Sequence, residues 1–484
     1  MSTRETDPRP NIIWIMSDDL SWGDLGCYGQ EKIATPNIDA LAEAGTRFTQ
    51  AYCGSPICAP SRSTLMQGLH SGHATVRANM MPVEGGRYRH SLQAEDITVA
   101  ECLHAAGYAT GMFGKWGLAL QDQPGRPLHK GFETFVGYLN QRRAHSYYPQ
   151  WLWNGETKME YPQHDGWHHH EPRRYDENGR IVLDMMKDPD RAQYSFDVYA
   201  EASRQWVREN AHRPFFLYLP YTIPHGALCV PELGRYTDLD WPDVRHKEWA
   251  AMITRMDDEI GRLVALLKDL DVFDNTLILF CSDNGYSARG YVKEEEEPPT
   301  FDEFFGHSGP FRGGKGNLNE GGLRVPMIAH WPGHVPAGQV CDQPWAFYDF
   351  FPTACELAGA KPPSNLDGVS IAPYLRGEGN VPEREFFYWE FCESFKAQQA
   401  VRMGPWKAFR AHPGEPTELY AIEDDPGEQN DLAAEHPDVV RRAEELFEQE
   451  HVQSPIFCDP GEDEAAWRTR MRREGCELRD NLEF

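Results

Sequence analysis

The chain has 484 residues, 25% of them charged, with 47 Lys and Arg against 75 Asp and Glu and a net charge of −28 at pH 7. The average share of charged residues excludes an intrinsically disordered chain. The surplus of negative charge argues against nucleic acid or an anionic membrane as a partner, because the summed field repels polyanions. No apolar run approaches the roughly 18 residues that a membrane span needs.

The cysteines and the N-terminus indicate the compartment. Eleven cysteines without a CxxC spacing are typical of free, mostly buried thiols in a reducing environment. The first ten residues are polar and contain no apolar signal segment. We therefore expect a cytoplasmic protein, and a periplasmic or secreted one if a leader has been removed.

Strand-like and helix-like segments alternate over the first two-thirds of the chain. The apolar run NIIWIM predicts a strand buried on both faces, and the 3.6-residue period of residues 246–270 predicts a long amphipathic helix. The expected elements, in chain order, are strand 11–16, helix 36–44, helix 98–107, strand 109–113, helix 197–209, strand 214–221, helix 246–270, strand 276–282 and strand 325–331. This order predicts an α/β/α sandwich with a large, mostly parallel sheet.

The texture changes at residues 360–385, which are rich in proline and glycine. Short strands at 386–391, 400–403, 407–410 and 418–422 and a charged helix at 437–450 are then expected. We therefore predict a large α/β domain over residues 1–375, with insertion loops at about 140–195. A small α+β subdomain with an antiparallel sheet follows over residues 376–484.

Polar side chains follow four of the predicted strands. They are Asp18 and Asp19, Lys115, His225, and Asp283 with Asn284. Active sites of open α/β sheets gather beyond the carboxyl ends of the strands, so these groups should meet. Three aspartates and one asparagine supply only oxygen donors, which suits a hard cation: Ca²⁺ is favoured and Mg²⁺ is possible.

The segment Cys58-Ala59-Pro60-Ser61-Arg62 precedes a short helix expected at residues 61–67. A buried structural cysteine and a reactive thiolate, as in a redox or thiol enzyme, are both compatible with this position, since helix N-termini lower thiol pKa values. Neither explains the oxygen-only cluster or the lysine and histidine after the strands.

With these residues in view, the chain resembles the sulfatase family of the alkaline-phosphatase-like superfamily, and in particular its carbohydrate-directed bacterial members. The pattern C-x-P-S-R marks conversion of the cysteine to formylglycine by a maturase, and Cys58–Arg62 matches it in full. Further matches are SDDLSWGDLGCYG at 17–29, GKW at 114–116, DNG at 283–285, GGKGNLNEGGLRVP at 313–326 and ELYAIEDDPGEQNDL at 418–432.

The resemblance implies a role for each site residue. Asp18, Asp19, Asp283, Asn284 and residue 58 would hold the cation, Arg62 would brace residue 58, Lys115 and Lys315 would bind sulfate oxygens, and His225 would protonate the departing alcohol. The chemistry fits, because a sulfate monoester is an anion whose oxygens need neutralising before attack. A hydrated aldehyde offers an attacking hydroxyl, and its second hydroxyl lets the covalent sulfate leave by elimination.

One position departs from the family pattern. Many sulfatases have histidine two residues after the lysine of GKW, where this chain has Gly117, and His307 is a candidate to replace it as the base of the elimination step.

The substrate expectation comes from QRRAHSYY at 141–148, where Arg142, Arg143 and His145 beside aromatic residues are typical of a sugar pocket. We expect a small sulfated saccharide, of galactose type. Two alternatives stay open: a phosphodiesterase or phosphonate monoester hydrolase of the same superfamily, and a non-catalytic protein that binds sulfated glycans.

Overall fold

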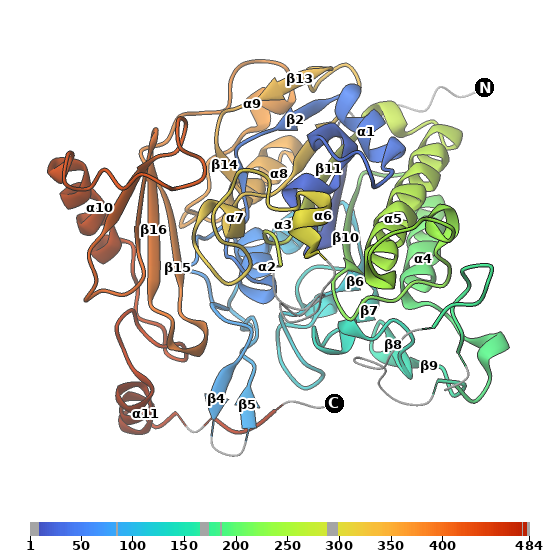
Figure 1. Ribbon diagram of the computed structural model, residues 1–484, viewed down its shortest axis with the longest axis horizontal. Helices are drawn as coiled ribbons and strands as arrows, with labels where there is room; N and C mark the ends of the chain where they lie inside the picture. Colours follow the sequence, from blue (N-terminus) through green and yellow to red (C-terminus); the bar gives the residue numbers. More distant parts are fainter. Residues whose placement is uncertain are drawn as a thin grey trace.

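The computed structural model describes residues 9–83, 86–164, 174–183, 186–287, 299–476 and 478–481. A ten-stranded sheet lies between two layers of helices, and a smaller four-stranded sheet stands beside it (Figure 1). None of the helices in these ranges is long and apolar enough to cross a membrane.

The large sheet is mixed, with a parallel centre formed by β11, β1, β10, β6 and β7. In spatial order its strands are β13 (Gln339–Cys341), β2 (Thr46–Phe48), β12 (Met327–His330), β11 (Thr276–Ser282), β1 (Asn11–Asp18), β10 (Phe215–Pro224), β6 (Ala109–Lys115), β7 (Thr134–Tyr138), β8 (Trp151–Asn154) and β9 (Thr157–Glu160). The expected strand at 325–331 is β12, and it runs antiparallel to β11. The predicted α/β/α sandwich is confirmed.

The central strand β1 is buried on both faces, as its continuous apolar run predicts. Successive side chains of a strand point to opposite faces, so Ile12, Trp14 and Met16 join one hydrophobic core, whereas Ile13 and Ile15 join the other. Two cores on one strand require a helical layer on each side of the sheet.

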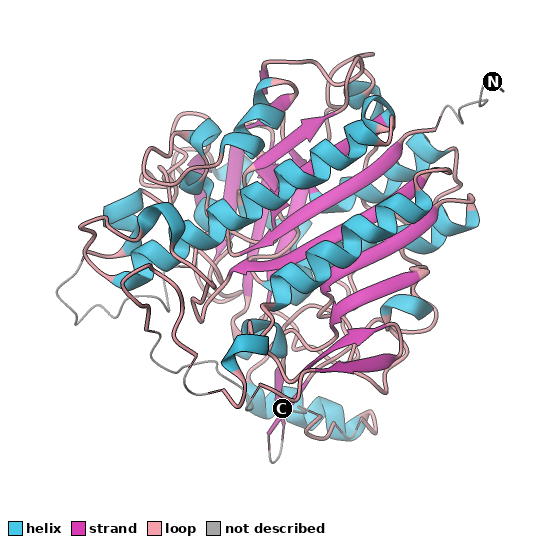
Figure 2. Ribbon diagram, turned by 90° about the vertical axis from the view of Figure 1, so that its right-hand side faces the viewer, coloured by secondary structure: helices cyan, strands magenta, loops and turns pink. Residues whose placement is uncertain are grey.

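The long helices α4 (Ser195–Asn210) and α5 (Val244–Asp269) cover one face, which Figure 2 shows from the front. The opposite core is formed with α2 (Cys58–Gln67), α3 (Val99–Ala105) and α8 (Phe350–Ala358). The other helices are α1 (Pro36–Glu43), α6 (Phe301–Phe305), α7 (Glu320–Leu323), α9 (Ala372–Leu375), α10 (Pro437–Gln449) and α11 (Glu464–Arg473). The capping box predicted by Thr98 and Glu101 begins α3.

The segment 140–195 was expected to form only insertion loops, and this is wrong for its first part. Strands β8 and β9 form an antiparallel hairpin that extends the large sheet beyond β7. Aromatic residues of β8, Trp151 and Trp153, fit a half-buried pleated surface, but the segment is too short and aromatic-rich to show clear strand alternation.

The C-terminal sheet is antiparallel, as expected. Its strands are β15 (Phe387–Phe391), β16 (Gln398–Met403), β17 (Trp406–Arg410) and β18 (Glu418–Ala421). Two short pairs complete the strands: β3 (Ala51–Tyr52) with β14 (Trp345–Ala346), and the hairpin of β4 (Met81–Val83) and β5 (Gly86–Tyr88).

Buried charges join this sheet to the large domain. The Nζ of Lys407 on β17 lies 2.9 Å from Glu320 Oε1 at the start of α7 and 3.0 Å from Glu428 Oε1. Burial favours the neutral acid, but Lys407 and Arg324 outweigh it and lower the pKa of Glu320 to about 2. A fully buried lysine between two carboxylates needs both partners in place, so the small sheet is held in one position.

Candidate active site

The four predicted clusters meet at one edge of the large sheet. Asp18 is the last residue of β1 and Lys115 the last residue of β6, while His225 follows β10 and Asp283 follows β11. These strands are neighbours and parallel, so their carboxyl ends lie together. The structure therefore brings these groups together at this edge of the sheet.

Two lysine–carboxylate pairs form the floor of the site. Lys115 Nζ lies 2.6 Å from Asp18 Oδ2, and Lys315 Nζ lies 2.5 Å from Asp19 Oδ1. Burial alone would raise the pKa values of Asp18 and Asp19, but the neighbouring cations lower both. Both carboxylates are therefore ionised at neutral pH, and the two lysines offset the repulsion between their charges.

The third aspartate is bound by an arginine. Arg62 on α2 donates to Asp283 Oδ2 from Nε at 3.2 Å and from NH2 at 2.8 Å, and its NH1 donates to the Lys115 carbonyl at 2.7 Å. Asp283 in turn accepts a hydrogen bond from the Asp19 backbone amide at 3.2 Å. The guanidinium therefore connects α2 to the ends of β6 and β11, and fixes the helix that carries residue 58.

Cys58 is the first residue of α2, three positions earlier than the helix start expected from the sequence. Pro60 is compatible with this because a proline in the first helical turn removes no intrahelical hydrogen bond. The Sγ lies 3.3 Å from Lys315 Nζ and 3.6 Å from Asp18 Oδ1. Burial raises the pKa of the Cys58 thiol to about 12 even though both lysines oppose the shift.

A thiol that stays protonated is a poor nucleophile, because the thiolate is the reactive form. The raised pKa therefore argues against a reactive thiolate at Cys58.

His225 lies beside the same carboxylates. Its Nε2 lies 3.4 Å from Asp19 Oδ2, and its ring stacks on His145 with the centroids 3.7 Å apart. The hydroxyl of Tyr147 donates to the His225 carbonyl. Burial lowers the pKa of His225, while Asp19 partly opposes that shift.

The donor set fits a hard divalent cation. Asn284 donates from Nδ2 to Asp19 Oδ1 at 2.7 Å, and its Oδ1 is buried with no hydrogen-bond partner among the described residues. An orphaned buried carbonyl oxygen beside three carboxylates costs free energy unless a cation is bound. Asp19 also has a φ of 64°, an uncommon conformation for a non-glycine residue that often marks functional sites.

Gly117 has a φ of 80°, in the region that favours glycine, so a histidine there would be strained. A Cβ at this position would lie 3.1 Å from Gln141 Oε1. That oxygen is buried and has no hydrogen-bond partner in the described part of the chain. Gln141 is therefore the polar side chain beside Gly117.

His307, the suggested substitute, lies elsewhere. Its Nδ1 pairs with Asp24, and its ring packs against Trp249 and Phe301. The described contacts place His307 under the start of α5 and do not bring it to Cys58. Phe301 is a near neighbour in the sequence, whereas Trp249 and Asp24 come from distant segments that local spacing could not reveal.

The three predicted sugar-binding residues separate in space. His145 reaches the site through its stack on His225, whereas the Arg143 guanidinium lies 3.4 Å from the Trp151 ring centroid and faces β8. Arg142 is half-buried, and Arg87 helps to lower its pKa. His145 therefore contacts a residue of the central cluster.

Sequence reasoning missed a group beside Cys58 that lies in none of the matched motifs. Asn79 Oδ1 accepts from the Ala59 amide at 3.0 Å, and the Asn79 amide donates to Glu393 Oε2 at 2.6 Å. Glu393 acts electrostatically on Arg89 and on Lys315. These residues come from three distant segments, so no local spacing could reveal them.

A second histidine–carboxylate cluster lies at the end of α2. His70 Nε2 is 3.1 Å from Glu450 Oε2, and His73 Nδ1 is 3.0 Å from Asp367 Oδ2. The Gly72 amide donates to His70 Nδ1, so Nε2 carries the proton and donates to Glu450. The cluster is therefore a hydrogen-bonded link between α2 and the end of α10.

The fold and the site define a sulfuric ester hydrolase. Residues 10–360 match the family model described as Sulfatase, and residues 314–453 match the C-terminal model described as N-sulphoglucosamine sulphohydrolase. The chain belongs to the sulfatase family. Its large sheet and separate antiparallel sheet are those of the alkaline-phosphatase-like fold.

Individual relatives agree with this assignment. The chain is similar to N-acetylgalactosamine-6-sulfatase of Sus scrofa, with 31% identity over 82% of this chain and 71% of the relative. It is similar to arylsulfatase A of Homo sapiens, with 31% identity over 90% and 87% of the two chains. A solved structure, Ps i-CgsB in complex with k-i-k-neocarrahexaose, has a TM-score of 0.74 at 28% identity and covers 96% of this chain and 98% of its own.

Proposed function

We propose that this sulfatase hydrolyses sulfate monoesters on small galactose-type saccharides and releases inorganic sulfate. The observation that carries the proposal is the convergence of Cys58, Lys115, Lys315 and His225 on one group of buried carboxylates. The sugar class is supported by the name of one relative, N-acetylgalactosamine-6-sulfatase, and by the k-i-k-neocarrahexaose in a similar structure.

In this proposal Cys58 is the precursor of formylglycine, and a maturase carries out the oxidation. Conversion exchanges the sulfur for oxygen and removes two hydrogens, so the thiol with its raised pKa is not the working group. Once hydrated, the aldehyde supplies a hydroxyl nucleophile and a second hydroxyl for release of the sulfate.

The chain's own residues then have distinct tasks. Lys115 and Lys315 neutralise the sulfate oxygens, which otherwise repel an attacking oxygen. Arg62 holds α2 against Asp283, so residue 58 keeps its position. His225 and Lys315 contact different oxygens of Asp19. In its imidazolium form, which the charge of Asp19 favours, His225 donates a proton from Nε2 to the departing alcohol. Its neighbour His145 orients the ring by stacking.

We propose Ca²⁺ as the cation, held by Asp18, Asp19, Asp283, Asn284 and residue 58. When bound, it supplies positive charge that offsets the sulfate and polarises the nucleophile. The three carboxylates are balanced by Lys115, Lys315 and Arg62, so a divalent cation gives the site a net positive charge for an anionic ester.

Removing the metal should lower both stability and activity. A ligand at a hundredfold excess over its Kd stabilises the folded state by about 2.7 kcal/mol. Thermal unfolding after chelation, and again after addition of Ca²⁺ or Mg²⁺, therefore measures which cation the site binds more tightly. We expect Ca²⁺ to raise the Tm more than Mg²⁺ at equal concentration, and Asn284→Ala to reduce that rise. Asp438→Asn on the exposed face of α10 is the control and should respond like the wild type. A larger Tm rise with Mg²⁺ would refute the choice of metal.

Turnover on a substrate panel tests the function. After co-expression with a maturase, sulfate release from 6-sulfated galactose and N-acetylgalactosamine saccharides is compared with hydrolysis of aryl phosphate diesters and aryl phosphonates. We expect kcat/KM for a galactose-type sulfate to exceed that for the phosphorus esters by at least about a hundredfold, a difference of about 2.7 kcal/mol. The reverse order would favour the phosphodiesterase alternative, and tight binding without sulfate release would favour a glycan-binding protein.

A further inference from the structure

Arg89 is a buried arginine beside the active site whose side chain has no assigned task. It directly follows β5, and only 5% of its surface is exposed. Its Nε is buried without a hydrogen-bond partner, and no hydrogen bond joins its guanidinium to any other described residue. A buried guanidinium with unmet donors is costly, so such a group is retained where a ligand satisfies it.

The surroundings of Arg89 carry surplus positive charge. Burial lowers the pKa of Arg89 to about 10; Arg142 and Arg87 also lower it, whereas Glu393 and Cys58 oppose the shift. Cys58 and Glu393 are therefore close enough to act on the guanidinium. Arg87 and Arg142 thus act on Arg89 with the same sign of charge, whereas each lysine of the central site is paired with an aspartate.

Glu393 does not compensate Arg89 fully. Its Oε2 accepts from the Asn79 amide at 2.6 Å, and burial raises its pKa. Asn79 in turn accepts from the amide of Ala59, the neighbour of Cys58. Glu393 and Asn79 thus link Arg89 to the start of α2, where residue 58 lies.

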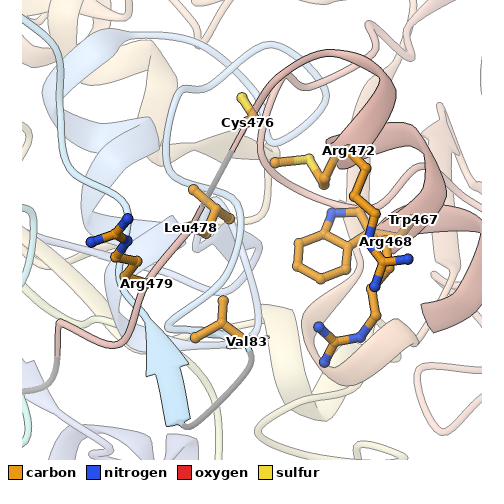
Figure 3. A pocket seen from close by; sticks show the side chains of 8 residues that line it. Val83, Trp467, Arg468, Arg472, Cys476, Leu478 and Arg479 are labelled. Carbon is orange, nitrogen blue, oxygen red and sulfur yellow. The ribbon is translucent and has the colours of Figure 1, made fainter.

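The C-terminal tail holds the backbone of this group. The Arg89 amide donates to Asn481 Oδ1 at 2.8 Å, and Asn481 Nδ2 donates back to the Arg89 carbonyl at 3.0 Å. Leu478 and Arg479 of the tail lie beside Val83 of β4, and they face Trp467 of α11 across a cavity of about 480 Å³ (Figure 3). The backbone N–H and the carbonyl of Arg89 are therefore both held by a residue about 390 positions later in the chain.

We propose that Arg89, with Arg87 and Arg142, forms a second anion subsite that binds a sulfate or carboxylate group of the saccharide other than the sulfate being cleaved. This inference rests on the proposed function and narrows it to substrates with at least two negative groups. A guanidinium suits such a group, because its planar donors match the oxygens of sulfate and carboxylate. Such a subsite would also let a protein with a net negative charge bind an anionic substrate, because the arginines attract the substrate at short range.

The test compares substrates with one and two anionic groups. Sulfate release is measured for a monosulfated disaccharide, for the same disaccharide with a second sulfate, and for one with a uronate carboxylate. Arg89→Gln should reduce the ratio of kcat/KM between doubly and singly anionic substrates by at least about tenfold, mainly through KM. Arg89→Lys should restore part of that ratio, and the substrate whose ratio falls more identifies the natural second group.

Arg441→Gln is the matched control, because Arg441 lies on the exposed face of α10 and forms an ion pair with exposed Asp438. It should leave the ratio at the wild-type value. An unchanged ratio in Arg89→Gln, or equal losses on all three substrates, would overturn the subsite. Asn481→Ala should also lower the ratio of kcat/KM, but by a smaller factor. This variant loses the hydrogen bonds that hold the Arg89 backbone, whereas the charge of Arg89 remains.

Calorimetry separates this subsite from the hydrolytic proposal. Binding of the disulfated disaccharide to Cys58→Ala is compared with binding to Cys58→Ala combined with Arg89→Gln, so no turnover is needed. A weaker affinity of the double variant by at least about tenfold supports the subsite even if wild-type protein releases no sulfate. Equal affinities of the two proteins, or binding to neither, would overturn it.

Discussion

Replacing Cys58 with alanine is expected to abolish sulfate release, with a loss in kcat on the order of 10⁴ or more, as for the removal of other covalent nucleophiles. Alanine cannot be converted to an aldehyde, so the attacking oxygen is lost. The fold should persist, because the side chain contributes only Sγ contacts to Lys315 and Asp18. Sulfate release and thermal unfolding measure the two effects separately.

Cys53→Ala is the matched control for this experiment. Cys53 is an equally buried thiol five residues earlier, and its Sγ contacts the carbonyls of Ser55 and Gly322 instead of the charged cluster. Its removal should lower stability by about 1 kcal/mol and leave kcat within a few fold. Peptide mass spectrometry across residue 58 completes the test. Full activity in protein that keeps an intact cysteine there would contradict the formylglycine proposal.

His225→Ala should produce the second-largest loss, and the loss should depend on the leaving group. A sugar alkoxide needs a proton as it departs, so we expect a decrease of about 10²–10⁴ in kcat/KM for saccharide sulfates. An activated aryl sulfate leaves without that proton and should lose far less. A series of aryl and alkyl sulfates measured on wild type and variant gives this dependence directly.

Equal losses across the leaving-group series would instead assign His225 to binding. The stack with His145 allows an internal comparison, because His145→Ala removes the ring contact and keeps the Nε2 of His225 beside Asp19. We expect His145→Ala to lower kcat/KM for all esters by a similar factor, without the steep dependence on the leaving group.

The site illustrates which parts of a sequence carry tertiary information. Asp18, Lys115, His225 and Asp283 each end or follow a buried strand, so their meeting could be predicted from strand order alone. The orientation of Arg143 toward Trp151 could not, since neighbouring residues of a turn point in different directions. The surroundings of His307 could not be predicted for a similar reason, because its partner Asp24 is far away in the chain.

The sequence by itself determined the central architecture and the chemical inventory. Continuous apolar runs predict strands that are buried on both faces. Polar residues just after such strands lie at the carboxyl ends, where parallel strands bring them together. Only the tertiary structure decided that β12 is antiparallel, that β8 and β9 extend the sheet, and that Asn481 holds the backbone of Arg89. The physical reason is that local pattern records burial and period, whereas pairing direction and contacts between distant segments depend on packing of the whole chain.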